Sequence, residues 1–168
     1  VIFASAYPIT TDMDACACTV NSGVTIVIPS GHTLNVKNAV NVLGTGSLTF
    51  NNNASLIQDP NTTVNNNTGS ITYKRNTTPV RRRDFTYWSA PVSGFMLYDL
   101  SPATDYRMFQ KYDPDTGWVS IINGNGAMIK GVGYIVRAPE TNSNTVGSIY
   151  PASFVGIPNN GDVNVIPV

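Results

Sequence analysis

Apolar and polar residues alternate along the N-terminal third of the chain, and turn-forming residues interrupt this alternation at regular intervals. The alternation and the turns divide the sequence into steps of six to eight residues: CTVNSG, VTIVIPSG, HTLNVKN, AVNVLGTG, SLTFNNN and ASLIQD. A period of two predicts short β-strands. Gly and Asn tolerate the backbone angles of tight corners, and three such steps would form one coil of roughly 20 residues. Residues 1–58 are therefore predicted to form a β-solenoid-like (β-helix-like) segment, with an antiparallel meander as the alternative.

The pattern changes after this segment. Residues 59–70, DPNTTVNNNTGS, are polar and predict an Asn-rich linker. The β-runs that follow are longer and more aromatic, and DPDTG at residues 113–117 predicts a tight turn between two of them. Residues 71–168 are predicted to form a β-sandwich-like or jelly-roll-like domain. It is expected to be incomplete, because a sandwich needs about seven strands and the sequence ends within a β-run. The opening VIFASAYPITTD has no Met, so we expect a piece of a longer polypeptide.

Composition supports an all-β fold and narrows the classes of partner. Charged residues make up only 12% of the chain, and residues that favour helices are scarce beside Asn, Thr, Val and Ile. Ten basic residues balance ten acidic ones, so the chain lacks the basic excess that draws a protein to nucleic acid. No apolar run approaches the roughly 20 residues of a membrane-spanning helix. Neither a nucleic-acid partner nor a spanning segment is therefore expected.

Candidate binding residues cluster at RRRDFTYWSAP, which starts at Arg81. If the whole stretch were a strand, Arg81, Arg83, Phe85 and Tyr87 would share one face and Arg82, Asp84, Thr86 and Trp88 the other. The favoured interpretation is structural, with arginine stems covering aromatic rings and Arg82 paired with Asp84 or stacked near Trp88. The alternative is a carbohydrate or partner contact, with an aromatic ring as the stacking surface. Its candidate residues are Arg82, Tyr87, Trp88 and Trp118.

The sequence gives little support for a catalytic site or a metal site. Glycoside hydrolysis needs two carboxylates at a set separation, and no such pair can be identified among nine Asp and one Glu. His32 is the only histidine, and no Gly-x-Ser-x-Gly motif accompanies it. Asp113 and Asp115 belong to a turn motif that lacks the other ligands of a calcium loop. We predict no enzyme activity, no catalytic residues, no cofactor and no metal site.

The two cysteines, Cys16 and Cys18, are separated by one residue. If they lay on one strand they would point to the same face, roughly 6.5 Å apart. That distance is near the limit of disulfide geometry. Two small buried thiols and a strained disulfide therefore both remain open.

Several long stretches resemble a module of secreted cell-surface proteins of flavobacteria and other Bacteroidetes. They are TVNSGVTIVIPSGHTLNV, GSLTFNNNASLIQ, ITYKRNTTPVRRRDFTYWSAPVSG, GVGYIVRAP and FVGIPNNGDV. The resemblance implies export by type IX secretion, an extracellular or cell-surface location, and a non-enzymatic structural or adhesive role, in some proteins linked to gliding motility. It also implies that the partners are other domains of the same long polypeptide.

The sequence leaves two other functions open. A carbohydrate-binding module would place Tyr87, Trp88 or Trp118 on an exposed surface and would take cell-surface glycans as partners. A filament subunit or export cargo would leave a strand edge near the C-terminus to be completed by another chain, with export or outer-membrane proteins as partners.

Overall fold

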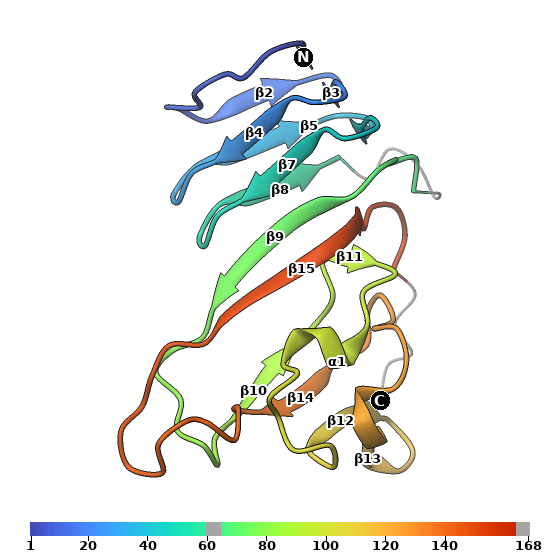
Figure 1. The fold of residues 1–168 in the computed structure, drawn as a ribbon. Helices are drawn as coiled ribbons and strands as arrows, with labels where there is room; N and C mark the ends of the chain where they lie inside the picture. The colour runs from blue at the N-terminus through green and yellow to red at the C-terminus, as the bar shows by residue number, and fades with distance from the viewer. Residues whose placement is uncertain (60–64, 164–168) are drawn as a thin grey trace. The chain divides into compact units, whose positions relative to one another are not determined.

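The computed structural model describes residues 1–59 and 65–163, which form two compact units (Figure 1). Unit 1 comprises Val1–Arg75 and Ser153–Asp162, and unit 2 comprises Asn76–Ala152 with the final segment from Val163. Strands account for 41% of the structure and helix for 4%. The prediction of an all-β protein is therefore confirmed, in the form of several small sheets.

Unit 1 is built from short strands. Eight of them precede residue 60: β1 (Ile2–Phe3), β2 (Met13–Ala15), β3 (Cys18–Val20), β4 (Thr25–Ile28), β5 (Thr33–Val36), β6 (Val40–Val42), β7 (Ser47–Phe50) and β8 (Ser55–Gln58). Of these, β3–β8 follow the predicted steps, and β1 and β2 precede them. The longer strands β9 (Ile71–Asn76) and β15 (Pro151–Pro158) follow, and β9 lies beside both β7 and β15. The two limits between the units fall within β9 and β15, and not in the Asn-rich stretch where the sequence placed a linker.

The strand pairs among β1–β9 are parallel, so the alternative of an antiparallel meander is wrong. These pairs are β1 with β3, β2 with β5, β3 with β6, β4 with β7, β5 with β8, and β7 with β9. Cys18 lies opposite Val40, Thr25 opposite Ser47, and Thr33 opposite Ser55, 22 residues later in each case. One turn of the chain therefore places each strand beside its counterpart in the next turn. The three sheets that result contain β1-β3-β6, β2-β5-β8 and β4-β7-β9.

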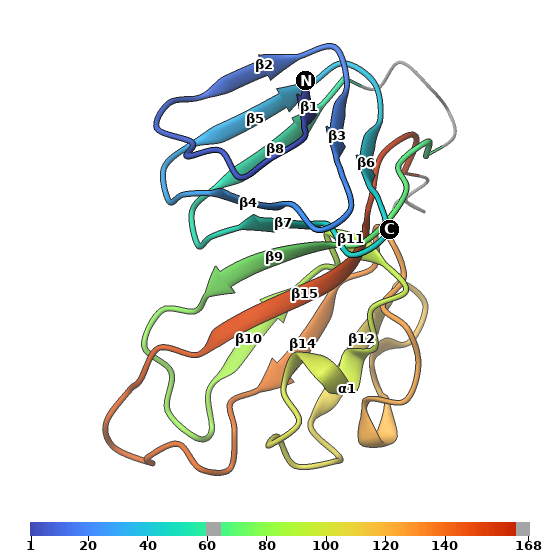
Figure 2. The same ribbon diagram turned by 45° about the horizontal axis from the view of Figure 1, so that its top comes forward.

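The three sheets surround a common interior (Figure 2). Alternate side chains of their strands are buried there. Burial follows the alternation closely, for example in β4, where Ile26 and Ile28 are buried while Thr25 and Val27 are exposed. The fully buried side chains that fill this interior include Val20, Ile26, Ile28, Leu34, Val40, Leu48 and Phe50.

Cys16 and Cys18 are free thiols, and the structure corrects the geometry expected for them. β2 ends at Ala15 and β3 begins at Cys18, so a corner separates the two residues and the two-residue alternation of a strand does not apply. Cys16 is exposed and Cys18 is buried. Burial raises the pKa of the Cys18 thiol to about 11, which makes it unreactive at neutral pH.

Unit 2 contains a four-stranded antiparallel sheet in the order β10-β14-β12-β13. The predicted turn at DPDTG is confirmed, because it joins β12 to β13 with Tyr112 opposite Trp118. One face of the sheet is buried by Phe109, Tyr134 and Val136. The elements of this unit are β10 (Phe85–Trp88), β11 (Val92–Ser93), α1 (Leu97–Leu100), β12 (Phe109–Asp113), β13 (Gly117–Ser120), the 3₁₀ turn η1 (Ile122–Gly124) and β14 (Tyr134–Arg137).

The described part of the Asn-rich stretch is a structural component of unit 1, which corrects its prediction as a linker; residues 60–64 lie outside the described residues. Asn67 is buried, and its Oδ1 accepts hydrogen bonds from the Val40 amide at 2.8 Å and from Gln58 Nε2 at 2.9 Å. Its Nδ2 donates to Gln58 Oε1 and to the Pro158 carbonyl. One amide side chain thus joins β6, β8 and β15, and it supplies an acceptor for the Val40 amide in a buried position.

Replacing Asn67 with Ala is therefore expected to lower the free energy of unfolding by about 2–4 kcal/mol, because the Val40 amide loses its acceptor and half-buried Gln58 loses two hydrogen bonds. Urea denaturation measures this change. Asn66→Ala is the matched control, because Asn66 is exposed and should shift stability by less than about 0.5 kcal/mol. Equal effects of the two substitutions would contradict the bridging role of Asn67.

Candidate functional site

The first part of RRRDFTYWSAP is a turn and not a strand, which corrects the predicted faces. Asp84 N–H donates to the Arg81 carbonyl, and the Asp84 carboxylate accepts from the Arg81 amide at 2.8 Å and from Arg81 Nε at 3.3 Å. β10 begins only at Phe85. Asp84 is therefore the partner of Arg81, and the predicted pairing of Arg82 with Asp84 or Trp88 is replaced by an ion pair between Arg82 and Glu140.

The strand that follows the turn separates the two candidate aromatic residues. Phe85 and Tyr87 are exposed, with 40% and 76% of their surface accessible, whereas Thr86 and Trp88 are half-buried on the opposite side of β10. This is the ordinary alternation of a strand with one face against the core. Tyr87 therefore belongs to the exposed face of the sheet, and Trp88 does not.

The β12–β13 hairpin brings two more aromatic side chains to the exposed face. Tyr112 and Trp118 are directly opposite one another, each about two-fifths exposed, with ring centroids 5.2 Å apart in an edge-to-face arrangement. The Tyr87 ring lies 6.0 Å from that of Trp118, although β14 and β12 separate their strands. We call Phe85, Tyr87, Tyr112 and Trp118 the aromatic face.

Polar and aliphatic side chains complete this surface. Ile135 of β14 lies opposite Tyr87 on one side and opposite Gln110 on the other, and Gln110 lies opposite Ser120. Directly opposite residues of antiparallel strands point to the same face. The aromatic face therefore has amide and hydroxyl groups among its rings.

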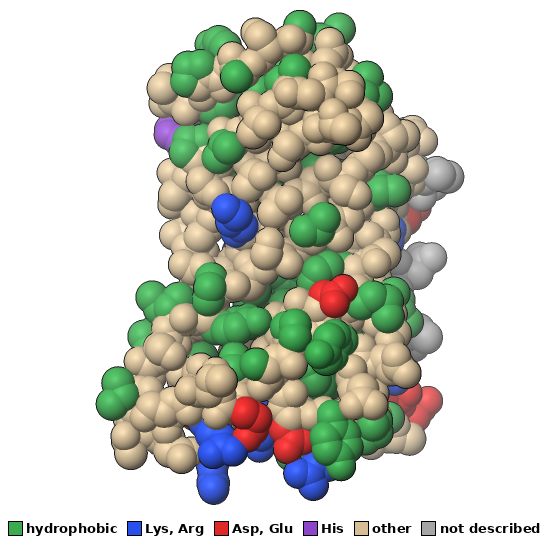
Figure 3. All heavy atoms as spheres, viewed as in Figure 1, with side chains coloured by type: hydrophobic (Ala, Val, Ile, Leu, Met, Phe, Trp, Pro, Cys, Tyr) green, Lys and Arg blue, Asp and Glu red, His purple; other side chains and the backbone are tan. Residues whose placement is uncertain are grey.

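An open hollow of about 320 Å³ adjoins the aromatic face and is lined by Arg82, Arg83, Phe85 and Arg137. Arg137 lies opposite Phe85 across β10 and β14, so both point to the exposed side of the sheet. We call this site the arginine hollow. Figure 3 shows basic and acidic side chains gathered at the lower margin of that view, with few charges over the rest of the visible surface.

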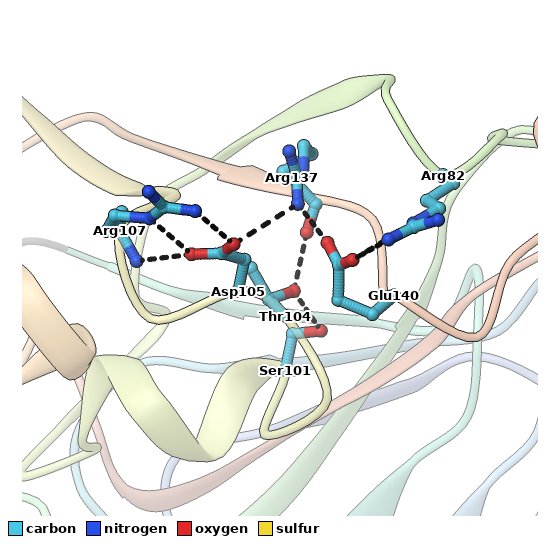
Figure 4. Close-up of polar contacts among 7 residues, drawn as sticks. All are labelled: Arg82, Ser101, Thr104, Asp105, Arg107, Arg137 and Glu140. Atoms are coloured by element: carbon cyan, nitrogen blue, oxygen red, sulfur yellow. Dashed lines mark hydrogen bonds and ion pairs between the residues drawn. The ribbon is translucent and has the colours of Figure 1, made fainter.

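A network of ion pairs holds the arginines in place (Figure 4). Glu140 bonds to Arg82, through Nε at 3.0 Å and through Nη2, and also to Arg137 Nη2. Asp105 pairs with Arg107 at 3.0 Å and reaches Arg137 at 3.9 Å. Arg137 thus stands between two carboxylates, and only 16% of its side chain is accessible.

Thr104 anchors the backbone beneath this network. Its hydroxyl donates to the Arg137 carbonyl at 2.6 Å and contacts the Ser101 hydroxyl at 2.9 Å. Thr104 and Ser101 are both buried. The loop that follows α1 is therefore tied to the end of β14, where Arg137 projects into the hollow.

The network also shifts the acidities of its carboxyl groups. Hydrogen bonds from the Arg107 side chain and backbone lower the pKa of Asp105 to about 2. Hydrogen bonding to Arg82, with Arg137 nearby, lowers the pKa of Glu140. Both groups are therefore charged at neutral pH, and they orient the arginines while neutralising part of their charge.

The other sequence candidates have local structural roles. His32 Nδ1 lies 3.3 Å from Asp12 Oδ1. His32 is half-buried and Asp12 is exposed, and Asp12 also accepts a hydrogen bond from the Thr33 amide, so the contact stabilises a corner between strands. Asp113 accepts three hydrogen bonds from Asp115 and Thr116, as a turn residue does. Within residues 1–59 and 65–163, no three His, Cys, Asp or Glu side chains gather as metal ligands would.

A second hollow, of about 480 Å³, lies in unit 1 over β2, β5 and β8. Its polar groups include Asp14, which accepts a hydrogen bond from Asn35 Nδ2 at 2.9 Å, together with Lys37 and Asp59. No aromatic side chain of the described residues lines this hollow, so it offers no ring on which a ligand could stack. It is therefore a weaker candidate for a binding site than the aromatic face.

The structure thus brings together Tyr87, Trp118 and Arg82 from the sequence candidates and leaves Trp88 on the other side of the sheet. Sequence reasoning missed Tyr112 and Arg137 as site residues. The turn signal at DPDTG could have identified Tyr112, because a hairpin there places it opposite Trp118. No local signal marks Arg137, whose place depends on the pairing of β10 with β14. In the part of the chain that the structure describes, no helix has the length and apolar character needed to cross a bilayer.

The network makes stability depend on acid pH. The pKa of Asp105 is about 2 in the folded chain against an ordinary value of 3.8, and that of Glu140 is also lowered. Stability from both groups should be present above their ordinary pKa values and lost as pH falls toward their folded values. Urea midpoints measured from about pH 6 to about pH 2.5 should fall, and Asp105→Asn should flatten that fall. An unchanged slope in Asp105→Asn would contradict the assignment.

Comparison with known proteins identifies a family but no characterised relative. No curated protein and no solved structure matches the chain. One family matches residues 3–167, which is nearly the whole chain. The chain belongs to the family described as "Domain of unknown function (DUF8693)".

Proposed function

We propose that the chain is a non-enzymatic structural and adhesive module of a larger bacterial surface protein, and that its aromatic face binds carbohydrate. The observation that carries this proposal is the aromatic face itself. Tyr87, Tyr112 and Trp118 stand on the exposed side of a sheet whose other side is core. Grouped aromatic side chains exposed to water mark interaction surfaces, because covering them with a ligand is favourable.

Carbohydrate fits the chemistry of this face. The C–H faces of a pyranose ring are apolar and stack on aromatic rings, while its hydroxyls need hydrogen-bond partners at the edge. Gln110 and Ser120 lie on the same side of the sheet as the rings and supply such partners. A rigid sheet holds the aromatic rings in fixed positions, which lowers the entropic cost of binding.

Unit 1 is proposed to act as a short β-solenoid that supports the binding unit. The 22-residue parallel register and the interior shared by its sheets support this interpretation. Each coil would hold the next through backbone hydrogen bonds, as in repeat proteins generally. Unit 2 is proposed to be sandwich-like, with the four-stranded sheet as one of its layers.

The cellular setting is a proposal that rests on sequence resemblance. The stretch KRNTTPVRRRDFTYWSAPV and the low content of charged residues support a secreted or cell-surface protein of Bacteroidetes, exported by type IX secretion and functioning in adhesion or gliding. The alternative function, a filament subunit or export cargo, predicts a strand edge near the C-terminus that another chain completes. Residues 164–168 lie outside the described residues, and the last described strand, β15, lies beside β9.

Binding of neutral and acidic oligosaccharides to the full chain tests this proposal, by glycan array and then by isothermal titration calorimetry. Tyr87→Ala and Trp118→Ala should each weaken binding roughly tenfold, because each removes a stacking surface. Tyr98→Ala is the matched control: Tyr98 is an exposed tyrosine of α1, outside the aromatic face, and its loss should change affinity less than about twofold. Binding that is unaffected by Tyr87→Ala and Trp118→Ala would contradict the proposal.

A further inference from the structure

We propose that the ligand of the aromatic face is an acidic carbohydrate, and that the carboxylate of a uronic or sialic acid residue binds in the arginine hollow. This inference rests on the proposed carbohydrate-binding function and specifies its substrate class. It joins two features of unit 2, the rings of β10, β12 and β13 and the arginines beside them.

The two features form one continuous surface through Phe85. Phe85 lines the hollow and is also the first exposed residue of β10, and Tyr87 follows two residues later on the same side. Two residues of a strand span about 6.5 Å, similar to the length of one sugar unit. A chain of sugars stacked on Tyr87 and Trp118 can therefore place the next unit over Phe85, with its substituents in the hollow.

The hollow retains positive charge after its own ion pairs are formed. Glu140 bonds to both Arg82 and Arg137, and Asp105 reaches Arg137 but is paired mainly with Arg107. Two carboxylates therefore serve these three arginines. Arg83 lines the hollow, is exposed, and has no hydrogen-bond or ion-pair partner among the described residues. The buried Nε of Arg137 has no hydrogen-bond acceptor there either.

A carboxylate is the group that these donors fit best. A guanidinium presents parallel N–H donors that match the two oxygens of a carboxylate, and such charge-assisted bonds are stronger than neutral ones. Neighbouring arginines outside the hollow are already paired with carboxylates: Arg81 with Asp84, and Arg107 with Asp105. The unbalanced charge is therefore local, which suits sugars with single carboxylates.

A nucleic-acid strand has similar needs, but the charge distribution favours the sugar. Single-stranded nucleic acid requires a basic groove that follows its backbone. Here the formal net charge of the chain is zero, and Asp105, Asp84 and Glu140 stand among the arginines. A repeated phosphate backbone would meet these carboxylates, whereas a carboxylate on one sugar need only reach Arg83 and its neighbours.

The test compares matched acidic and neutral probes with the full chain. The probes are a galacturonate oligosaccharide and its methyl ester, sialyllactose and lactose, and an oligothymidylate, measured by calorimetry at low and high salt. At least one acid should bind about tenfold tighter than its neutral counterpart, and the difference should shrink as salt rises. Arg83→Ala should reduce acid binding to the level of the neutral probe while leaving the neutral probe unchanged within about twofold.

Arg81→Ala is the control, because it removes the same charge two residues away, outside the hollow, and should change acid affinity less than about twofold. Arg83→Lys should restore only part of the affinity, because it keeps the charge without the paired donors. Equal binding of acidic and neutral probes, or equal effects of Arg81→Ala and Arg83→Ala, would overturn this inference and leave the carbohydrate function standing. Failure of every sugar to bind would overturn both, and tighter binding of the oligothymidylate would replace the sugar with nucleic acid.

Discussion

The structure depends on one constraint, the strict alternation of side chains between the two faces of a β-strand. In unit 2, burial of Phe109, Tyr134 and Val136 fixes which face of the sheet is core. Alternation then turns the intervening side chains toward solvent, and Tyr112, three positions after Phe109, reaches the surface beside Trp118 in this way. The core and the proposed binding surface are therefore set by the same pairing of strands, and a shift of register by one residue would exchange them.

The same alternation organises unit 1, where it is combined with a repeat along the chain. Strands 22 residues apart pair in parallel, so the apolar residues of each strand lie beside the equivalent residues of its partner. Corners interrupt the ladder, and their polar groups need partners. Gly69 approaches Val42 so closely that an added Cβ would lie 2.0 Å from the Val42 carbonyl oxygen, and this close approach brings the chain past β6 next to Asn67.

Local patterns predicted the elements well, because strands and turns have local signals. The Asn and Gly corners marked the limits of β3–β8, and DPDTG marked the β12–β13 hairpin. The candidate site was only partly predictable, for two physical reasons. Hydrogen bonds from Arg81 to Asp84 form a turn where continuous alternation predicted a strand. The partner of Arg82 is Glu140, 58 residues away, and only the antiparallel pairing of β10 with β14 brings them together.

The central claim is that the exposed side of the β10-β14-β12-β13 sheet binds carbohydrate, and the most direct test is to locate a bound oligosaccharide by NMR. Amide and indole signals of the isotope-labelled chain would be followed as a galacturonate oligosaccharide is added. We expect the largest shifts at Tyr87, Tyr112, the Trp118 indole and the arginine hollow, with unit 1 unchanged. Shifts confined to unit 1, or to the buried side of the sheet around Trp88, would contradict the claim.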